Sequence, residues 1–283
     1  MHYDGKYVGF ASLVFAWLVC MSWGNGYAQD VIGEITASPP SEEVTFSYEG
    51  DTGPAFWGSL SPDWETCGTG MAQSPIDFTA VNITESDPSV LEFNYNPTPF
   101  NMLNNGHTIE VTYAPGSALV IQGETFEVKQ FHFHTLSEHT IEQGAHYPIE
   151  MHIVHQNSQG TNAVVSVMIR PGAANPALEP IERIQQLIPL TAGVTNNFSA
   201  LLINVGDLLP ATRQFIHYTG SLTTPPCTEG VAWYVLQTPI EMSEDQIRVL
   251  KGALNQLDSA SSSGTNNRPP QLLNGRTISR GGE

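Results

Sequence analysis

Residues 130–134 constrain the fold more than any other part of the chain. Their sequence, Gln-Phe-His-Phe-His, alternates polar and aromatic residues. Such alternation predicts a β-strand, because successive side chains of a strand point to opposite faces of the sheet. One face would carry two phenyl rings that can pack in a core. The other would hold His132 and His134 close together at one point in space.

A second alternating segment, residues 150–155, follows further along the chain. As a strand it would place Glu150, His152 and Val154 on one face. If the two strands pair, three imidazoles converge, with Gln130 and Glu150 beside them as polar supports. Three neutral imidazoles with an open fourth position are what a catalytic zinc site requires, and neighbouring acid or amide oxygens fix the tautomers of ligand histidines. Spacing alone leaves open the alternative that these are ordinary hydrogen-bonded histidines.

Strand-like runs separated by turn residues recur along the chain and predict a β-rich domain. No internal repeat or second domain boundary is evident. Two helices are also expected: an apolar stripe covers residues 179–188, and a capping box at 243–246 precedes a second stripe that reaches Leu257. The strands are expected at residues 91–95, 108–113, 118–121, 125–134, 149–156, 163–169 and 231–237.

The charge of the chain argues against two classes of partner. Acidic residues number 28 against 10 Lys and Arg, which gives a formal net charge of −18. Such a charge repels nucleic acid and anionic membranes. A small neutral substrate would not be repelled.

The N-terminus has the features of a targeting segment. Residues 8–23 are mostly apolar but form a run that is short for a membrane span, and Gly26-Tyr27-Ala28 places small residues at the two positions that signal peptidase reads. We therefore predict a signal peptide over residues 1–28, export to the periplasm or extracellular space, and no membrane attachment after cleavage; the alternative is an uncleaved anchor. Residues 29–50 are polar and are expected to form a flexible lead-in, with the catalytic domain over 51–283.

Cleavage after Ala28 would remove Cys20 and leave Cys67 and Cys227. An even pair of cysteines in an exported chain predicts one disulfide. It would close a loop of about 160 residues, which chain-entropy models associate with a stabilisation on the order of 4–5 kcal/mol.

Several motifs taken together resemble those of the α-class carbonic anhydrases. The motifs occur in the same order as in that family, over about residues 48–276. They are residues 130–134, Ser137-Glu138-His139, residues 150–155, Gly220-Ser221-Leu222-Thr223-Thr224-Pro225-Pro226, Gln73-Ser74-Pro75-Ile76, residues 103–107, Trp233 and Asn267-Arg268-Pro269. The resemblance implies a β-rich α+β fold: a single domain built on a large, mainly antiparallel twisted central sheet with a few peripheral helices.

The same resemblance implies a function, which is the zinc-dependent, reversible hydration of carbon dioxide to bicarbonate and a proton by attack of a zinc-bound hydroxide. It also implies roles for individual residues. Zn²⁺ would be bound by His132, His134 and His152, with Gln130 and Glu150 accepting hydrogen bonds from the far ring nitrogens of His132 and His152. The pocket for the small-molecule substrate, carbon dioxide or bicarbonate, would be lined by Val154, Val164, Leu222, Thr224 and Trp233. Cys67 and Cys227 stand where exported members form their disulfide, and a homodimer is possible.

Three further residues would take part in proton movement. Thr223 would accept a hydrogen bond from the nucleophile and donate its own to Glu138, which turns the nucleophile's lone pair toward the substrate. His107 follows the turn at residues 104–106 and would carry protons between the site and solvent. Histidine suits this task because its free pKa is about 6.5. His139 and His155 are interpreted as structural, and His146 and His217 as surface or loop residues.

Some positions depart from the family pattern. Ser59 is interpreted as replacing a tyrosine that belongs to the solvent network of the pocket in the family. Thr135 replaces an aromatic residue that follows the second ligand, and Glu110 replaces an amide residue near the rim of the cavity. Asn82-Ile83-Thr84 and Asn197-Phe198-Ser199 match a glycosylation acceptor pattern, which has meaning only in a eukaryotic source.

Two alternatives to the carbonic anhydrase function are considered. One is a cupin-type metal oxygenase, in which Glu138 would itself bind the metal together with His132, His134 and His152. It leaves the segment 223–226 without a role. The other is a non-catalytic binding module on the same fold, against which the chain retains all three histidines together with Thr223 and Glu138.

Overall fold

The structure is a computed structural model that describes residues 44–79, 81, 83–85, 87, 89–141, 144–178, 188–189, 191–257, 262 and 264–282. The predicted signal peptide, residues 29–43 of the predicted lead-in, the helix expected over 179–188 (apart from its last residue) and Asn82 lie outside these residues. Within the described part of the chain, no helix combines the length and the apolar character needed to cross a bilayer.

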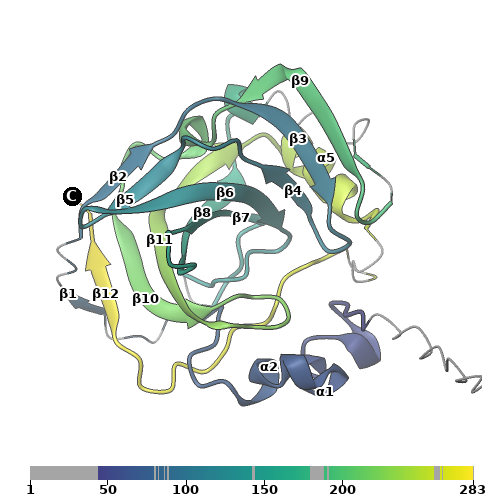
Figure 1. Cartoon of the computed structure of the whole chain (residues 1–283), viewed down its shortest axis with the longest axis vertical. Helices are drawn as coiled ribbons and strands as arrows, with labels where there is room; N and C mark the ends of the chain where they lie inside the picture. Colours follow the sequence, from purple (N-terminus) through teal and green to yellow (C-terminus); the bar gives the residue numbers. More distant parts are fainter. Residues whose placement is uncertain are drawn as a thin grey trace, which may run out of the picture. The chain divides into compact units, whose positions relative to one another are not determined.

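A large mixed sheet dominates the described residues (Figure 1). Its strands are β1 (Ile83–Glu85), β2 (Leu91–Asn94), β3 (Thr98–Asn104), β4 (Ile109–Thr112), β5 (Ala118–Ile121), β6 (Glu124–His134), β7 (Ile149–Gln156), β8 (Asn162–Pro171), β9 (Thr195–Ile203), β10 (Phe215–Ser221), β11 (Glu229–Met242) and β12 (Ile278–Gly281). The order is β1-β12-β10-β11-β8-β7-β6-β4-β3-β9, while β5 pairs with both β2 and β6. The β1–β12 and β8–β11 ladders are parallel, and the other described ladders are antiparallel.

The helices in the described residues are short and peripheral. They are α1 (Trp57–Leu60), α2 (Thr66–Thr69) and α5 (Glu244–Leu254), with 3-10 turns η1 (Gly50–Thr52), η2 (Pro62–Trp64), η3 (Pro176–Leu178) and η4 (Val205–Leu208). The capping box predicted for α5 is present, because the Ser243 hydroxyl accepts from the Gln246 N–H and the Gln246 side chain accepts from the Ser243 N–H. The helix ends at Leu254, and Leu257 is buried just beyond it.

The structure confirms the predicted fold class and all seven predicted strands, which correspond to β2, β4, β5, β6, β7, β8 and β11. Most boundaries agree within two residues, but β11 continues five residues further than expected, to Met242. The strands β1, β3, β9, β10 and β12 were not predicted. β3 contains Pro99 and three asparagines or threonines, so it lacks the composition typical of a strand.

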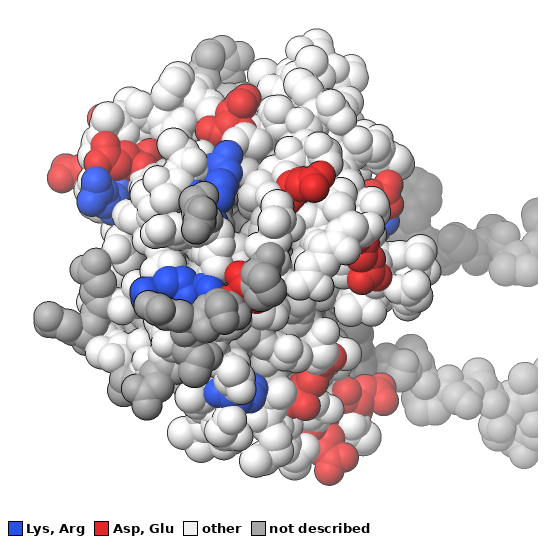
Figure 2. Space-filling view, turned by 90° about the vertical axis from the view of Figure 1, so that its left-hand side faces the viewer, with Lys and Arg blue, Asp and Glu red and all other residues white. Residues whose placement is uncertain are grey.

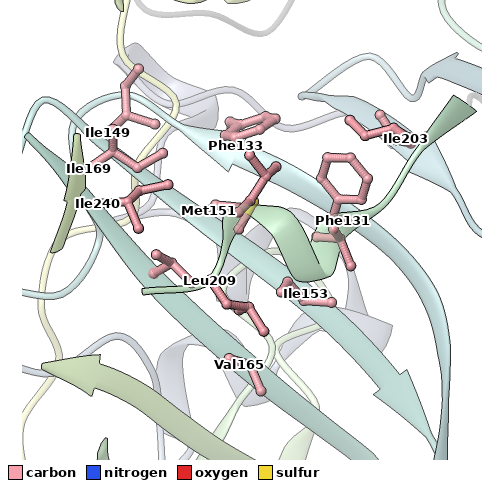
Figure 3. Close-up of a cluster of buried hydrophobic side chains, with 14 of the residues drawn as sticks. Phe131, Phe133, Ile149, Met151, Ile153, Val165, Ile169, Ile203, Leu209 and Ile240 are labelled. Carbon is pink, nitrogen blue, oxygen red and sulfur yellow. The ribbon is translucent and has the colours of Figure 1, made fainter. Parts of the chain in front are cut away.

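The two faces of β6 and β7 have opposite roles. Phe131, Phe133, Met151 and Ile153 are at most 1% exposed and belong to the main core, where Figure 3 shows them on neighbouring strands. Burial of each such side chain contributes about 1.5–3 kcal/mol. A slip of one residue between the strands would put histidines into this core, so the core fixes the register of the opposite face.

A second, smaller cluster lies beside α1 and α2. It contains Phe46, Tyr48 and Trp57 together with the predicted disulfide between Cys67 and Cys227, whose Cα atoms are 5.0 Å apart. Phe46 and Tyr48 are each 8% exposed and pack edge-on against Trp57. This end of the lead-in expected over residues 29–50 is therefore part of the folded unit.

On the face that Figure 2 shows, the charged residues are scattered rather than gathered in one patch. On the face shown in Figure 2, Lys and Arg side chains are interspersed with Asp and Glu on a largely uncharged surface. Some of these charges form pairs, as between Arg170 and Glu241 or Arg248 and Asp245. Such exposed pairs contribute little to stability, because water and salt screen them.

Candidate metal centre

Three imidazoles converge on the face of β6 and β7 that lies opposite the core. The register of the two strands pairs His132 directly with His152, and His134 follows two residues after His132 on the same face. One nitrogen from each ring lies within 4.8 Å of the others, and the His132 and His134 Nε2 atoms are 3.1 Å apart. Two nitrogens bound to one tetrahedral zinc lie roughly 3.3 Å apart, so this spacing suits a metal ion.

The opposite nitrogen of each ring is held by an oxygen atom. These contacts are all 2.7 Å long: His132 Nδ1 to Gln130 Oε1, His134 Nδ1 to the Asn266 carbonyl, and His152 Nε2 to Glu150 Oε1. The amide, carbonyl and carboxylate oxygens can only accept, so each of these ring nitrogens must donate a proton. The nitrogens that face one another are thereby left as lone-pair donors, which is the state that a metal ion needs.

Burial keeps these three rings neutral. His134 and His152 are each 1% exposed, and burial lowers the pKa of all three imidazoles, with further lowering from their neighbouring rings. Glu150 opposes this effect on each ring but does not overcome it. Neutral imidazoles are the form in which histidine binds metal.

Glu150 is fixed by five donors. Its Oε2 accepts from the backbone N–H groups of Glu138 and His139, and its Oε1 lies within 2.7 Å of His139 Nδ1, His152 Nε2 and Ser166 Oγ. Burial alone would raise the pKa of Glu150, but His139 and His152 hold that pKa well below its usual value through their charge interactions and hydrogen bonds. The carboxylate therefore orients His152 rigidly and also ties it to His139.

Glu138 lies beside the three rings without joining them. Its Oε1 accepts from the Arg268 backbone N–H at 2.8 Å, and its Oε2 is 3.5 Å from His134 Nε2. Burial raises the pKa of Glu138 to about 7. Oε2 has no hydrogen-bond partner among the described residues, although the Thr223 hydroxyl lies close enough to lower the pKa of this carboxyl.

The three rings form the floor of a cavity of about 420 Å³. A polar wall contains Asn105, which interacts with Glu110 and with the His107 backbone, and an apolar wall contains residues of one hydrophobic cluster, namely Val154, Val164, Leu222 and Trp233. All five residues predicted for the substrate pocket line this cavity, namely Val154, Val164, Leu222, Thr224 and Trp233. The arrangement can therefore bring a small apolar molecule against a metal ion held by the histidines.

His107 lines the same cavity, but its imidazole does not have the ordinary pKa on which the predicted role as a proton carrier rests. Its ring stacks on Phe46, and its Nδ1 is buried without a hydrogen-bond partner among the described residues. Burial lowers the pKa of His107 to about 4, well below the value of 6.5 for a free histidine. In this conformation the imidazole stays neutral at physiological pH.

A sequence profile of the family described as "Eukaryotic-type carbonic anhydrase" matches residues 52–281.

The chain belongs to the α-class carbonic anhydrase family.

A carbonic anhydrase from Nostoc sp. is 38% identical over 247 residues, which cover 86% of this chain and 89% of that protein. The solved α-carbonic anhydrase from Thermovibrio ammonificans, in complex with the inhibitor sulfanilamide, superposes with a TM-score of 0.75 at 36% identity and covers 84% of this chain and all of its own. Dioscorin complexed with ascorbate gives the same TM-score at 32% identity, covering 84% of this chain and 98% of its own. Carbonic anhydrases of this class are zinc enzymes that hydrate carbon dioxide.

Membership of this family also decides against the cupin-type oxygenase. In that alternative Glu138 would bind the metal. The carboxylate instead accepts from Arg268 and lies near Thr223. Among the described residues, two groups of side chains could share one ion, His132 with His134 and His152, and His139 with Glu150 and His152, and Glu138 belongs to neither.

One of the expected departures from the family pattern is wrong. Ser59 does not line the cavity: its exposed side chain donates to the Phe56 carbonyl at 2.8 Å. The tyrosine of the cavity is Tyr48, which lies in the segment expected to be a flexible lead-in. Glu110 does line the cavity, as expected, and Thr135 is buried, where its hydroxyl donates to the Gly264 carbonyl.

Four residues that contact the site were not predicted from the sequence. Asn266 accepts from His134, Ser166 contacts Glu150, Arg268 donates to Glu138, and Phe46 covers His107. Asn266 accepts through its backbone carbonyl, which every residue type has, so the sequence does not indicate this contact. The sequence did hold a signal for Arg268, because it stands within the motif Asn267-Arg268-Pro269.

Three of the four remaining histidines lie where the sequence predicts, and His217 does not. His139 bridges Glu150 and Tyr218, and His155 pairs with the Tyr95 hydroxyl in the core, so both are structural. His146 is exposed and lies outside the strands and helices, as predicted for a surface or loop residue, although its Nδ1 contacts the Ser137 carbonyl. His217 is instead half-buried within β10, where its Nδ1 contacts the Trp233 carbonyl.

Proposed function

We propose that this chain catalyses the reversible hydration of carbon dioxide with a zinc ion held by His132, His134 and His152. The observation that carries the proposal is the set of three facing nitrogens whose opposite ring nitrogens all donate to oxygen. Three imidazole nitrogens are also suitable ligands for zinc, because a catalytic zinc ion is typically four-coordinate, with protein ligands such as imidazole nitrogen and one open position.

A zinc ion bound by three neutral imidazoles acts as a Lewis acid that lowers the pKa of water to about 7, an effect for which carbonic anhydrase itself is the standard example. The residues of this chain determine how well that chemistry can work. Imidazoles kept neutral by burial add no negative charge to the ion, whereas thiolates would weaken the effect. Gln130, Glu150 and the Asn266 carbonyl hold the rings in the required orientation.

Thr223 and Glu138 are proposed to orient the attacking oxygen. If the Thr223 hydroxyl donates to the unpartnered Glu138 Oε2, its oxygen can only accept a hydrogen bond from the nucleophile. The nucleophile's lone pair then points toward the substrate. The Arg268 N–H supports this arrangement, because it holds the other oxygen of Glu138 in place.

The apolar wall is proposed to receive carbon dioxide. Val164 and Trp233 are each 2% exposed, and Leu222 and Val154 pack against the same cluster. The Trp233 indole N–H donates to the Ser221 carbonyl, which fixes the ring beside His152 with centroids 4.8 Å apart. A neutral, apolar substrate gains from leaving water at such a surface.

His107 is proposed to carry protons from the site to solvent. It lines the cavity, and its backbone N–H donates to Asn105 Oδ1, so the turn holds it at the polar wall. A shuttle operates best when its pKa is near the working pH. The proposal therefore requires that His107 leave its contact with Phe46, or gain water, during turnover.

Metal analysis combined with stopped-flow hydration of carbon dioxide tests the function. The zinc-loaded protein should hydrate carbon dioxide, and His152→Ala should lose both zinc and activity almost completely. His217→Ala serves as the control, since His217 lies outside the cavity lining. Undetectable hydration by the zinc-loaded protein would instead favour the non-catalytic binding module.

The same assay tests the shuttle. His107→Ala should lose part of its activity in weak buffer, and added imidazole should restore it, because a small base can carry the proton that the side chain no longer carries. Absence of rescue would contradict the shuttle role.

We also propose that the protein is exported and works in the periplasm or extracellular space. The Cys67–Cys227 disulfide supports this location, because disulfides persist in oxidising compartments. Sequencing the N-terminus of the mature protein tests the proposal, and a chain that begins at Gln29 is expected.

A further inference from the structure

Glu110 gives the polar wall of the cavity an unbalanced charge. It is the one carboxylate among the described residues that line the cavity, and that lining contains neither lysine nor arginine. Glu110 lies on β4, where the ladder with β6 pairs it with His132. Cross-strand partners have Cβ atoms about 4.5–5.5 Å apart, so its side chain emerges beside the first of the three imidazoles.

Asn105 supports the ionised form of Glu110. The Asn105 Oδ1 already accepts from the backbone N–H groups of His107 and Thr108, at 3.0 and 2.9 Å. Its NH₂ group is therefore the part left to face Glu110. Burial raises the pKa of Glu110, and the hydrogen bond from Asn105 works against that rise.

The two sides of the reaction differ in charge. Carbon dioxide is neutral, whereas bicarbonate is an anion, as are many small ions that bind zinc. A fixed carboxylate a few ångströms from the ligands repels an anion and leaves a neutral molecule unaffected. The repulsion is stronger inside a partly enclosed cavity than on the surface, because solvent and salt screen it less.

We propose that Glu110 is a specificity-determining residue that weakens the binding of bicarbonate and other monoanions in the cavity relative to carbon dioxide. The inference rests on the proposed function, because bicarbonate is the product of that reaction. In the hydration direction, Glu110 would favour release of the product. In the dehydration direction, it would raise the bicarbonate concentration needed for half-maximal rate.

Glu110→Gln tests the inference, because glutamine has nearly the same shape and lacks the charge. The KM for bicarbonate, divided by the KM for carbon dioxide, should fall about 3- to 10-fold, the range expected for one charge at this separation. The Kd for thiocyanate, measured by calorimetry on the zinc-loaded protein, should fall by a similar factor. Glu110→Ala removes the same charge and provides a second variant should the first fold poorly.

The matched control is Glu92→Gln on β2, an exposed glutamate that does not line the cavity. It changes the net charge by the same amount, so it should leave the thiocyanate Kd and the KM ratio unchanged. Equal effects of the two substitutions, or no effect of Glu110→Gln, would overturn the inference. Thiocyanate binding is read without turnover, so tighter binding by Glu110→Gln in a protein that hydrates no carbon dioxide would refute the proposed function and leave the charge effect standing.

Discussion

The ring of Phe46 stacks on the ring of His107, with centroids 3.6 Å apart and planes 16° from parallel. The two residues lie about sixty positions apart, and Phe46 belongs to the cluster around Trp57 that the disulfide supports. The small second core therefore controls the solvation of a residue in the cavity. Burial of this kind lowers the pKa of His107 to about 4.

We predict that Phe46→Ala raises the pKa of His107 toward 6.5, because water replaces the phenyl ring and stabilises the charged imidazole. The pKa is measured by NMR titration of the imidazole C–H resonances. Phe56→Ala, which removes an exposed phenyl ring, is the control. A pKa that stays near 4 in Phe46→Ala would show that other groups cause the desolvation. If His107 carries protons, the turnover rate in weak buffer should rise with its pKa.

The sequence was most informative where a pattern and a packing requirement coincide. The alternation in β6 and β7 predicted both the strands and the faces on which His132 and His152 lie, because a slipped register would bury imidazoles in the core. The N-cap of α5 was predicted because Ser243 and Gln246 form a local, reciprocal pair. These features depend on a few neighbouring residues and are therefore visible in the sequence.

The remaining features depend on contacts between distant parts of the chain. The acceptor for His134 is a backbone carbonyl 132 residues away, and any residue type could supply one. Phe46 was assigned to a polar lead-in because its neighbours are polar, although it packs on aromatic rings further along the chain. The low pKa of His107 follows from that packing, so the residue type alone suggested the ordinary value.

The carboxylate of Glu150 should matter more to the metal centre than the amide of Gln130. Glu150→Ala leaves five buried donors without an acceptor, and we expect zinc affinity to fall about 10- to 100-fold and the apo-protein to lose about 3 kcal/mol or more of unfolding free energy. Gln130→Ala removes one contact, that with His132, and should cost about 1 kcal/mol. Zinc competition titrations and urea unfolding measure the two effects. Equal losses in the two variants would contradict this ranking.

The Cys67–Cys227 disulfide should contribute a large share of the stability. The two cysteines are 160 residues apart, and chain-entropy models give about 5 kcal/mol for a loop of this size. We expect the double variant Cys67→Ser/Cys227→Ser to unfold at a clearly lower urea concentration than the oxidised wild type. Dithiothreitol should shift the wild type toward the variant and leave the variant unchanged. A variant as stable as the oxidised wild type would refute the expectation.

His155 should make the fold sensitive to acid. It is fully buried, with Nε2 2.7 Å from the Tyr95 hydroxyl, and burial lowers its pKa to about 4. As the pH falls, His155 of the unfolded chain binds a proton near pH 6.5, whereas His155 of the folded chain binds one only near pH 4. The free energy of unfolding therefore decreases as the pH falls from about 6.5 to 4, and above that range it does not depend on this histidine. The difference corresponds to about 3 kcal/mol. Urea unfolding at several pH values should give a shallower decline for His155→Gln; parallel declines would contradict the assignment.

Thr223 and Glu138 should act as one unit. Thr223→Val removes the hydroxyl, and Glu138→Gln replaces the carboxylate with an amide that can donate as well as accept. Each change should lower kcat/KM about 100-fold, in the range found for groups that orient or stabilise a reacting atom. Because each residue works through the other, the double variant should be no slower than either single variant. Stopped-flow hydration, with zinc content checked in every variant, measures the cycle. If the two losses multiply in the double variant, the residues act independently and the proposed orientation of the nucleophile fails.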